Sequence, residues 1–196
     1  MIKFICWNAR SINTLGALER LISLRKIHNL AMIVILEPFV NCSQIESYRM
    51  QMMMSHSFYN PNNKIWIFWN EEVKCRIIDS NQQYITCEIK HEDCNENFIM
   101  TYVYAKCKDQ WRKPLWDGML QWSDTNYLWC VIGDFNVIAS TQEKLGGRDY
   151  NISKSLKFLS IIEPCGLVDM RYIGQHYTWC NHRKDGATIW KGWIEV

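Results

Sequence analysis

Five polar side chains stand where apolar stretches of the sequence end. Asn8 follows "FICW", Glu37 follows "MIVIL" and Tyr104 closes "FIMTYVY". Asp134 and Asn136 follow "CVIG", with one aromatic residue between them. Each of these residues, taken alone, is also a common cap or turn residue. Ligands of α/β proteins collect at the ends of central strands, so the repeated placement predicts one shared crevice.

These residue types suit the hydrolysis of a phosphate ester. Mg²⁺ prefers oxygen ligands and keeps several waters, so Glu37, helped by the amide oxygen of Asn8, is a sufficient protein contribution when a phosphate supplies further oxygens. Asp134 is suited to orient and deprotonate an attacking water. Asn136 and the hydroxyl of Tyr104 are suited to donate to a phosphate oxygen as charge develops on it.

Length and composition favour one folded domain over residues 1–196. The chain is 48% apolar, and 196 residues can bury a sizeable core. Nine cysteines without any C-x-x-C pair argue against a disulfide scaffold or zinc site and favour a reducing compartment. The longest apolar run is too short to span a bilayer, and the amino terminus does not resemble a signal peptide. We therefore expect a soluble intracellular chain, with no membrane and no obligate protein partner.

The charge balance is nearly even, with 22 basic and 20 acidic residues and a net charge of +2. Affinity for a polyanion would therefore have to come from local basic clusters. Solvated surface is the alternative interpretation of every such cluster. The clusters are Lys106, Lys108, Arg112 and Lys113; Arg148, Lys154 and Lys157; and His182, Arg183 and Lys184.

The amino-terminal third predicts a strand, a helix and a second strand. The strand covers residues 2–7, and the helix follows with Thr14 as its N-cap and fades near residues 28–29. The second strand covers residues 32–36, and Pro38 stops it. Each of these two strands therefore positions the polar residue that follows it, Asn8 or Glu37.

The remainder predicts antiparallel strands followed by alternating helices and strands. Strands are expected over 64–70, 84–90, 98–104 and 127–133. The second has Ile85, Cys87 and Ile89 on one face and Thr86, Glu88 and Lys90 on the other. The helical spacing of apolar residues predicts two buried stripes. One stripe comprises Trp111, Leu115, Trp116, Met119 and Trp122; the other, in a helix over about 153–163, comprises Leu156, Leu159 and Ile162. The order of elements predicts a layered α/β protein with at least one mixed sheet.

Six blocks in order resemble the endonuclease/exonuclease/phosphatase superfamily. They are "ICWNAR", "VILEP", "VYAK", "VIGDFN", "GLVDM" and "HYTWCN", and they extend over essentially the whole chain. The "GDFN" motif within "VIGDFN" is the most specific of these matches. The set is most similar to the endonuclease domain of plant LINE-type (non-LTR) retrotransposons.

The resemblance implies a four-layer α/β sandwich with two mixed β-sheets, of the DNase I type. It implies cleavage of phosphodiester bonds in DNA that depends on Mg²⁺ or Mn²⁺, with nuclear residence following from that substrate. By matching blocks it implies Asn8 and Glu37 at the metal. It also implies Tyr104 and Asn136 on the phosphate, and Asp134 beside the nucleophilic water.

The carboxyl-terminal sequence departs from this family. Relatives have an Ile-Trp-x-Arg-Leu-Asp-Arg segment and later a Ser-Asp-His, whereas here "TIWKGWIEV" places Gly192, Trp193 and Ile194 around the expected aspartate. Because these blocks are absent, a final strand and loop are expected to be missing. None of the five histidines fits the position of the absent one, so nicking is expected to be very weak or absent. Pro38 also stands where relatives commonly have threonine.

Three hypotheses therefore remain open. The first is a DNA endonuclease of the retrotransposon type, and the second is an inactive remnant that keeps the fold and binds nucleic acid or protein. The third is a phosphatase acting on a small phosphorylated substrate. The "TWCN" and "GLVDM" blocks favour the first hypothesis over the third.

Overall fold

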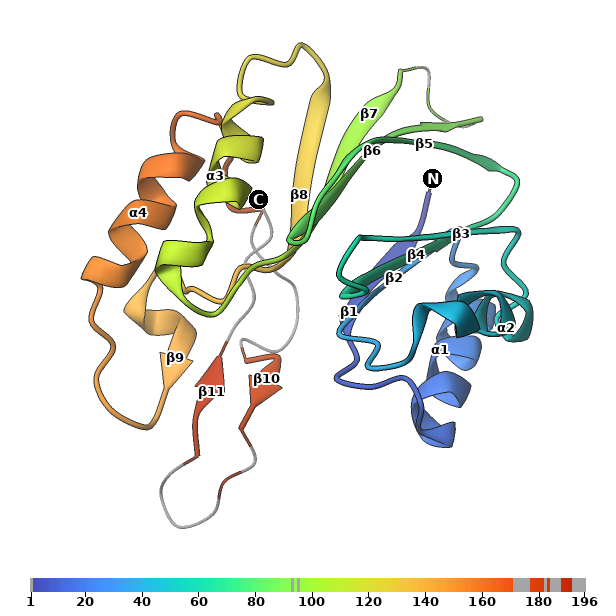
Figure 1. The fold of residues 1–196 in the computed structure, drawn as a ribbon, viewed down its shortest axis with the longest axis horizontal. Coiled ribbons are helices and arrows are strands. Elements are labelled where there is room, and N and C mark those ends of the chain that lie inside the picture. The colour runs from blue at the N-terminus through green and yellow to red at the C-terminus, as the bar shows by residue number, and fades with distance from the viewer. Residues whose placement is uncertain are drawn as a thin grey trace. The chain divides into compact units, whose positions relative to one another are not determined.

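The computed structural model describes residues 2–92, 94, 96–170, 177–181, 183 and 188–191 (Figure 1). The chain divides into two compact units. The first unit comprises Met1–Tyr104 and Tyr127–Gly133, and the second comprises Ala105–Asn126 and Asp134–Val196. Each unit is described by itself, and the single domain over 1–196 stays a prediction.

The first unit contains a four-stranded mixed sheet in the order β1-β2-β4-β3. Its strands are β1 (Phe4–Asn8), β2 (Met32–Leu36), β4 (Ile65–Trp69) and β3 (His56–Tyr59). β1 and β2 run parallel, whereas β4 is antiparallel to both β2 and β3. Every residue of β2 is buried, as expected for a central strand rich in β-branched residues.

Two helices cover one face of this sheet (Figure 1). They are α1 (Leu15–His28) and α2 (Ile45–Gln51). The predicted N-cap of α1 is confirmed, because the Thr14 hydroxyl accepts a hydrogen bond from the Ala17 N–H at 3.3 Å. Asn29 ends the helix in the left-handed conformation, where its N–H donates to the Arg25 carbonyl.

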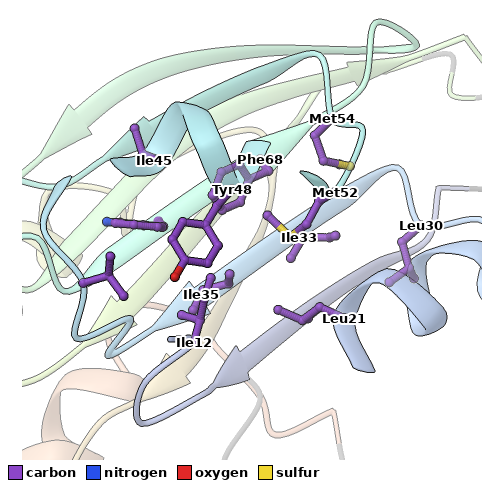
Figure 2. Close-up of a cluster of buried hydrophobic side chains, with 12 residues drawn as sticks. Ile12, Leu21, Leu30, Ile33, Ile35, Ile45, Tyr48, Met52, Met54 and Phe68 are labelled. Carbon is purple, nitrogen blue, oxygen red and sulfur yellow. The ribbon is translucent and has the colours of Figure 1, made fainter. Parts of the chain in front are cut away.

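The core between helices and sheet is built by alternate strand residues (Figure 2). Ile33 and Ile35 of β2 point into it, together with Phe68 of β4. Leu21 of α1 and Tyr48 of α2 pack against them from the helical side. Because side chains alternate along a strand, the residues between these point to the opposite face of the sheet.

The second sheet also lies in the first unit and has the order β5-β6-β7-β8. Its strands are β5 (Val73–Ser80), β6 (Tyr84–His91), β7 (Phe98–Tyr104) and β8 (Leu128–Asp134). β6 is antiparallel to both β5 and β7. β8 is the neighbour of β7, and the Trp129 indole N–H of β8 donates to the Thr101 hydroxyl of β7 at 2.9 Å.

The two sheets face each other, with the helices of the first unit on the far side of the first sheet (Figure 1). The hydroxyl of buried Tyr102 in β7 lies 3.9 Å from the sulfur of Met32 in β2. The predicted α/β class and two-sheet sandwich with mixed sheets are confirmed. Thr86 of β6 is also buried, and its hydroxyl lies 3.0 Å from that of Thr101.

The described residues of the second unit form two α-helices and a small three-stranded sheet in the order β10-β11-β9. The rings of Trp116, Phe135 and Phe158 pack together in it, with ring centroids 5.0 to 6.5 Å apart. Its elements are η2 (Asp109–Trp111), α3 (Lys113–Leu120), η3 (Thr141–Glu143), β9 (Lys144–Leu145), α4 (Ser153–Ile162), β10 (Trp179–Cys180) and β11 (Trp190–Lys191).

The inward faces predicted for the two helices were partly wrong. In α4, Leu156 and Leu159 are exposed, whereas Ser155 and Phe158 are buried. Phe158 has aromatic partners, and the Ser155 hydroxyl donates to the Ile138 carbonyl at 2.5 Å. These contacts decide which face of α4 is buried, rather than the helical spacing of the leucines. In the other stripe, Trp111 is half exposed in η2, and α3 ends at Leu120, before Trp122.

Candidate functional site

Glu37 stands directly after β2 in a left-handed conformation, with φ of 52°. Its N–H donates to the Lys64 carbonyl at 2.9 Å, and its carbonyl accepts from the Ser11 N–H at 2.9 Å. Non-glycine residues adopt this conformation rarely and at a cost in free energy. The ends of β1 and β4 therefore hold the backbone of Glu37 in a turn that the residue would not adopt freely.

The Glu37 carboxylate contacts two side chains. The Tyr104 hydroxyl, at the end of β7, donates to its Oε1 atom. The Arg10 Nε atom lies 3.8 Å from its Oε2 atom. The Glu37 side chain is only 13% exposed, so these contacts are shielded from solvent. The first unit thus brings together two of the predicted site residues, from positions 67 residues apart in the chain.

Asn8 is the last residue of β1 and pairs with Leu36, the residue before Glu37. Asn8 and Glu37 therefore stand at the same end of two adjacent parallel strands. This donor set fits Mg²⁺ only where a phosphate and water complete the coordination, because the protein offers one carboxylate and one amide. Among the described residues there is no cluster of three or more His, Cys, Asp or Glu side chains able to hold a metal alone.

Asp134 and Asn136 form a tight turn in the second unit. The Asn136 N–H donates to Asp134 Oδ1 at 2.9 Å, and Asn136 has φ of 52°. The Asn136 side-chain amide donates to the Ala105 carbonyl at 2.7 Å, while the Ala105 N–H donates to the Asp134 carbonyl at 2.8 Å. An amide carries two N–H donors, so one hydrogen bond to Ala105 leaves a further donor on Asn136.

Phe135, between these two residues, is buried, stacks on Trp116 and packs against the tilted ring of Phe158. The aromatic ring anchors the middle of the turn in the core of the second unit. Its neighbours Asp134 and Asn136 are only partly buried. The alternation of a buried ring with two polar residues explains the pattern of the "GDFN" block.

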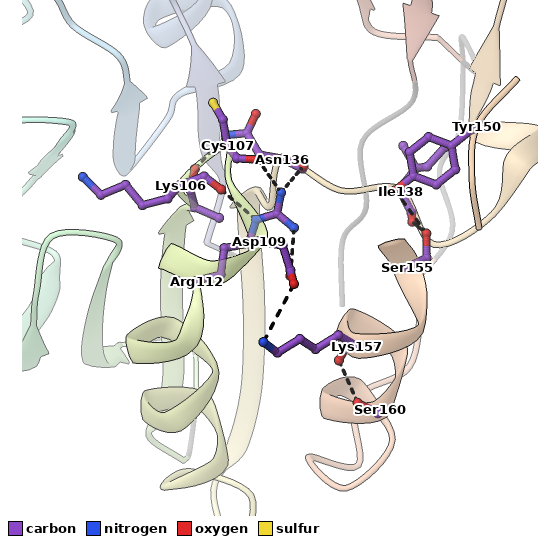
Figure 3. A network of polar contacts seen from close by, with 11 residues as sticks. Lys106, Cys107, Asp109, Arg112, Asn136, Ile138, Tyr150, Ser155, Lys157 and Ser160 are labelled. Atoms are coloured by element: carbon purple, nitrogen blue, oxygen red, sulfur yellow. Dashed lines mark hydrogen bonds and ion pairs between the residues drawn. The ribbon is translucent and has the colours of Figure 1, made fainter. Parts of the chain in front are cut away.

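Arg112 stabilises the turn of Asp134 and Asn136 through hydrogen bonds (Figure 3). The sequence did not predict this role. Its guanidinium donates to the carbonyls of Lys106 at 2.7 Å, Cys107 at 2.9 Å and Asn136 at 2.8 Å. Arg112 is 5% exposed, and this burial lowers its pKa below the usual value. The interpretation of Arg112 as part of a solvated basic cluster was therefore wrong. A single arginine in a basic sequence carries no signal that separates a buried role from an exposed one.

Three histidines lie in the described part of the chain. His28 is the last residue of α1, and His56 and His91 lie in β3 and β6. His56 lies 3.3 Å from Glu71 and stacks on Trp69. His176, His182 and the segment 192–196 lie outside the described residues. Among the helices described, none is long and apolar enough to cross a membrane.

No protein-family model and no curated sequence matches the chain. Its fold, however, is similar to solved structures over its full length. The endonuclease domain of TRAS1, a telomere-specific non-LTR retrotransposon, matches with a TM-score of 0.73 at 13% identity over 84% of that chain. An AP endonuclease from Archaeoglobus fulgidus matches with a TM-score of 0.72 at 18% identity over 86% of that chain.

A third neighbour is the 3′ phosphatase NExo from Neisseria, bound to a product DNA hairpin. It matches with a TM-score of 0.71 at 16% identity, over 100% of this chain and 86% of that one. These neighbours are members of the endonuclease/exonuclease/phosphatase superfamily, which includes nucleases and phosphatases. At these identities the likeness shows a common fold.

Proposed function

We propose that this chain is a metal-dependent phosphodiesterase of the DNA endonuclease type, which hydrolyses a phosphodiester bond with an activated water. The observation that carries the proposal is the Glu37 carboxylate, held in a left-handed turn between the Tyr104 hydroxyl and Arg10. Strained, partly buried charged residues of this kind concentrate at functional sites. The neighbouring nucleases of the same fold support the choice of reaction.

In this proposal Glu37 and Asn8 hold Mg²⁺ or Mn²⁺. The metal would supply Lewis-acid polarisation of a phosphate oxygen. Tyr104 positions the Glu37 carboxylate through its hydroxyl and contacts the phosphate when the substrate is bound. Arg10 adds positive charge beside a polyanionic substrate.

Asp134 orients the attacking water and accepts its proton. The hydrogen bond from the Asn136 N–H to Asp134 Oδ1 fixes the orientation of this carboxylate. The remaining amide donor of Asn136 stabilises the charge that develops on a phosphate oxygen. Arg112, which donates to the Asn136 carbonyl, is a positioning residue for the turn.

The element-type origin is the finer part of the proposal. The order of the six sequence blocks and the TRAS1 neighbour both support a retrotransposon endonuclease, of the plant LINE type by sequence. A chromosomal target implies nuclear residence.

The test is nicking of supercoiled plasmid by the purified chain with Mg²⁺. Glu37→Gln and Asp134→Asn should each lower the rate by at least ~10²-fold. The matched controls Glu72→Gln and Asp117→Asn, at exposed carboxylates, should leave it unchanged. DNA binding without any metal-dependent nicking would instead identify a silent remnant. Phosphate release from a small phosphorylated substrate, with plasmid untouched, would identify a phosphatase.

A further inference from the structure

Phe39 is an exposed aromatic residue two positions after Glu37. Its side chain is 54% exposed, and its φ of 50° lies in the left-handed region. Both features cost free energy, because a phenylalanine ring gains by burial and a non-glycine residue is strained at positive φ. Packing within the first unit therefore does not explain why the ring stands in solvent.

The loop that carries Phe39 is held by hydrogen bonds on both sides of the ring. The Pro38 carbonyl accepts from the Ile12 N–H at 3.0 Å. The Val40 carbonyl accepts from the side-chain amide of Asn63 at 2.6 Å. The ring is thus presented by a fixed backbone, so little conformational entropy is lost when a ligand stacks on it.

One cation lies over the Phe39 ring. The Lys64 ammonium lies 4.2 Å from the centroid of the Phe39 ring, in cation–π geometry. The backbone of Lys64 also accepts the Glu37 N–H, which ties this cation to the proposed metal ligand. The Arg10 Nε atom lies 3.8 Å from the Glu37 carboxylate, and the Arg10 side chain is 54% exposed. An exposed aromatic ring with one cation over it and a second cation at the neighbouring Glu37 is suited to a nucleobase between phosphates.

We propose that Phe39 stacks on an unpaired nucleobase next to the scissile phosphate, with Lys64 and Arg10 contacting the flanking phosphates. The inference rests on the proposed function, because it places the base beside the site of Glu37. A paired base is sandwiched by its neighbours within a duplex, so only an unstacked base offers a face to the ring. The preferred substrate class is therefore DNA with a single-stranded, gapped or bulged segment.

The experiment is fluorescence anisotropy of the full chain with a labelled single-stranded 12-mer and with a blunt duplex of the same sequence. EDTA is present, so binding is measured without metal or cleavage. Phe39→Ala should weaken single-strand binding by about 5- to 100-fold, since stacking on an aromatic residue contributes that much per base. Duplex binding should change much less.

Three further variants separate stacking from apolar contact and from charge. Phe39→Trp should bind the single strand at least as tightly as the native chain, whereas Phe39→Leu should weaken binding as Phe39→Ala does. Lys64→Ala should weaken binding and reduce its salt dependence. The control is Met53→Ala, because Met53 is also 54% exposed and left-handed, with φ of 53°, yet carries no ring. Circular dichroism confirms that each variant is folded.

Native-like single-strand affinity in Phe39→Ala would overturn the inference, as would native-like affinity in Phe39→Leu. Equal losses on single strand and duplex would also overturn it. These results are independent of the nicking assay. Ring-dependent binding without nicking supports the stacking site and removes the proposed reaction, whereas nicking that is indifferent to Phe39 does the reverse.

Discussion

Replacing Gly133 by alanine should destabilise the protein severely, because the end of β8 has no room for a Cβ atom. A Cβ built on Gly133 would lie 2.0 Å from the Val103 carbonyl oxygen and 2.8 Å from the Val103 carbonyl carbon and amide nitrogen. All three are backbone atoms of β7, so no side chain can move aside. Gly133 also has φ of 146°, a conformation that residues with a Cβ rarely adopt.

The expected loss is the sum of two effects. Unfavourable backbone conformation costs ~1 to 3 kcal/mol. Separating β8 from β7 to relieve the overlap costs a further ~1 to 3 kcal/mol, as for other overpacked sites. The total of about 2 to 6 kcal/mol is a large part of a typical domain's stability of ~5 to 15 kcal/mol.

Urea denaturation followed by circular dichroism measures this loss as a change in the free energy of unfolding. Gly16→Ala is the matched control, because Gly16 lies in α1 and a Cβ there meets no atom within 4 Å. That substitution should stabilise by up to ~1 kcal/mol, through the greater helix propensity of alanine. A Gly133→Ala variant within ~0.5 kcal/mol of the native chain would refute the reasoning.

Two further predictions concern polar contacts. Arg112→Lys keeps the charge but cannot reach three carbonyls with one planar fork, so the free energy of unfolding should fall by about 2 to 4 kcal/mol. Lys113→Ala, which removes an exposed ion pair with Asp117, should cost no more than ~0.5 kcal/mol in the same urea measurement. The Glu88 carboxylate accepts hydrogen bonds from Asn97 and Arg76, and these lower its pKa below the usual 4.5. Its contribution to stability should therefore be complete above pH 4.5 and be lost as pH falls through the lowered value. Melting temperatures from pH 7 to pH 2 should show a shallower acid decline in Glu88→Gln than in the control Glu72→Gln, and parallel curves would contradict this.

The sequence predicted the central strands well because short runs of apolar, β-branched residues indicate buried strands. "MIVIL" can only be a buried strand between a helix and Pro38, and it became β2. Glu37 and Tyr104 were predicted from their places at strand ends, and the hydrogen bond between them brings those ends together. Thr14 was predicted because an N-cap is a local signal that tertiary contacts rarely override.

Features that depend on distant partners were not predictable. The buried face of α4 was assigned to its leucines, but Phe158 had two aromatic partners from other segments and is the buried residue. Arg112 is buried because three carbonyls converge on it, and their convergence is a property of the fold alone. Glu37 and Phe39 adopt left-handed backbone conformations although neither is glycine or asparagine, so their residue types did not predict these turns. The roles of Asn8, Asp134 and Asn136 in catalysis stay predictions.

The most direct test of the central proposal is the difference between plasmid nicking rates in Mg²⁺ and in EDTA, measured for the native chain and for Glu37→Gln. We predict nicking in Mg²⁺ that EDTA abolishes and that Glu37→Gln loses. A rate that is the same in Mg²⁺ and EDTA, or the same in both proteins, would contradict a metal-dependent phosphodiesterase built on Glu37.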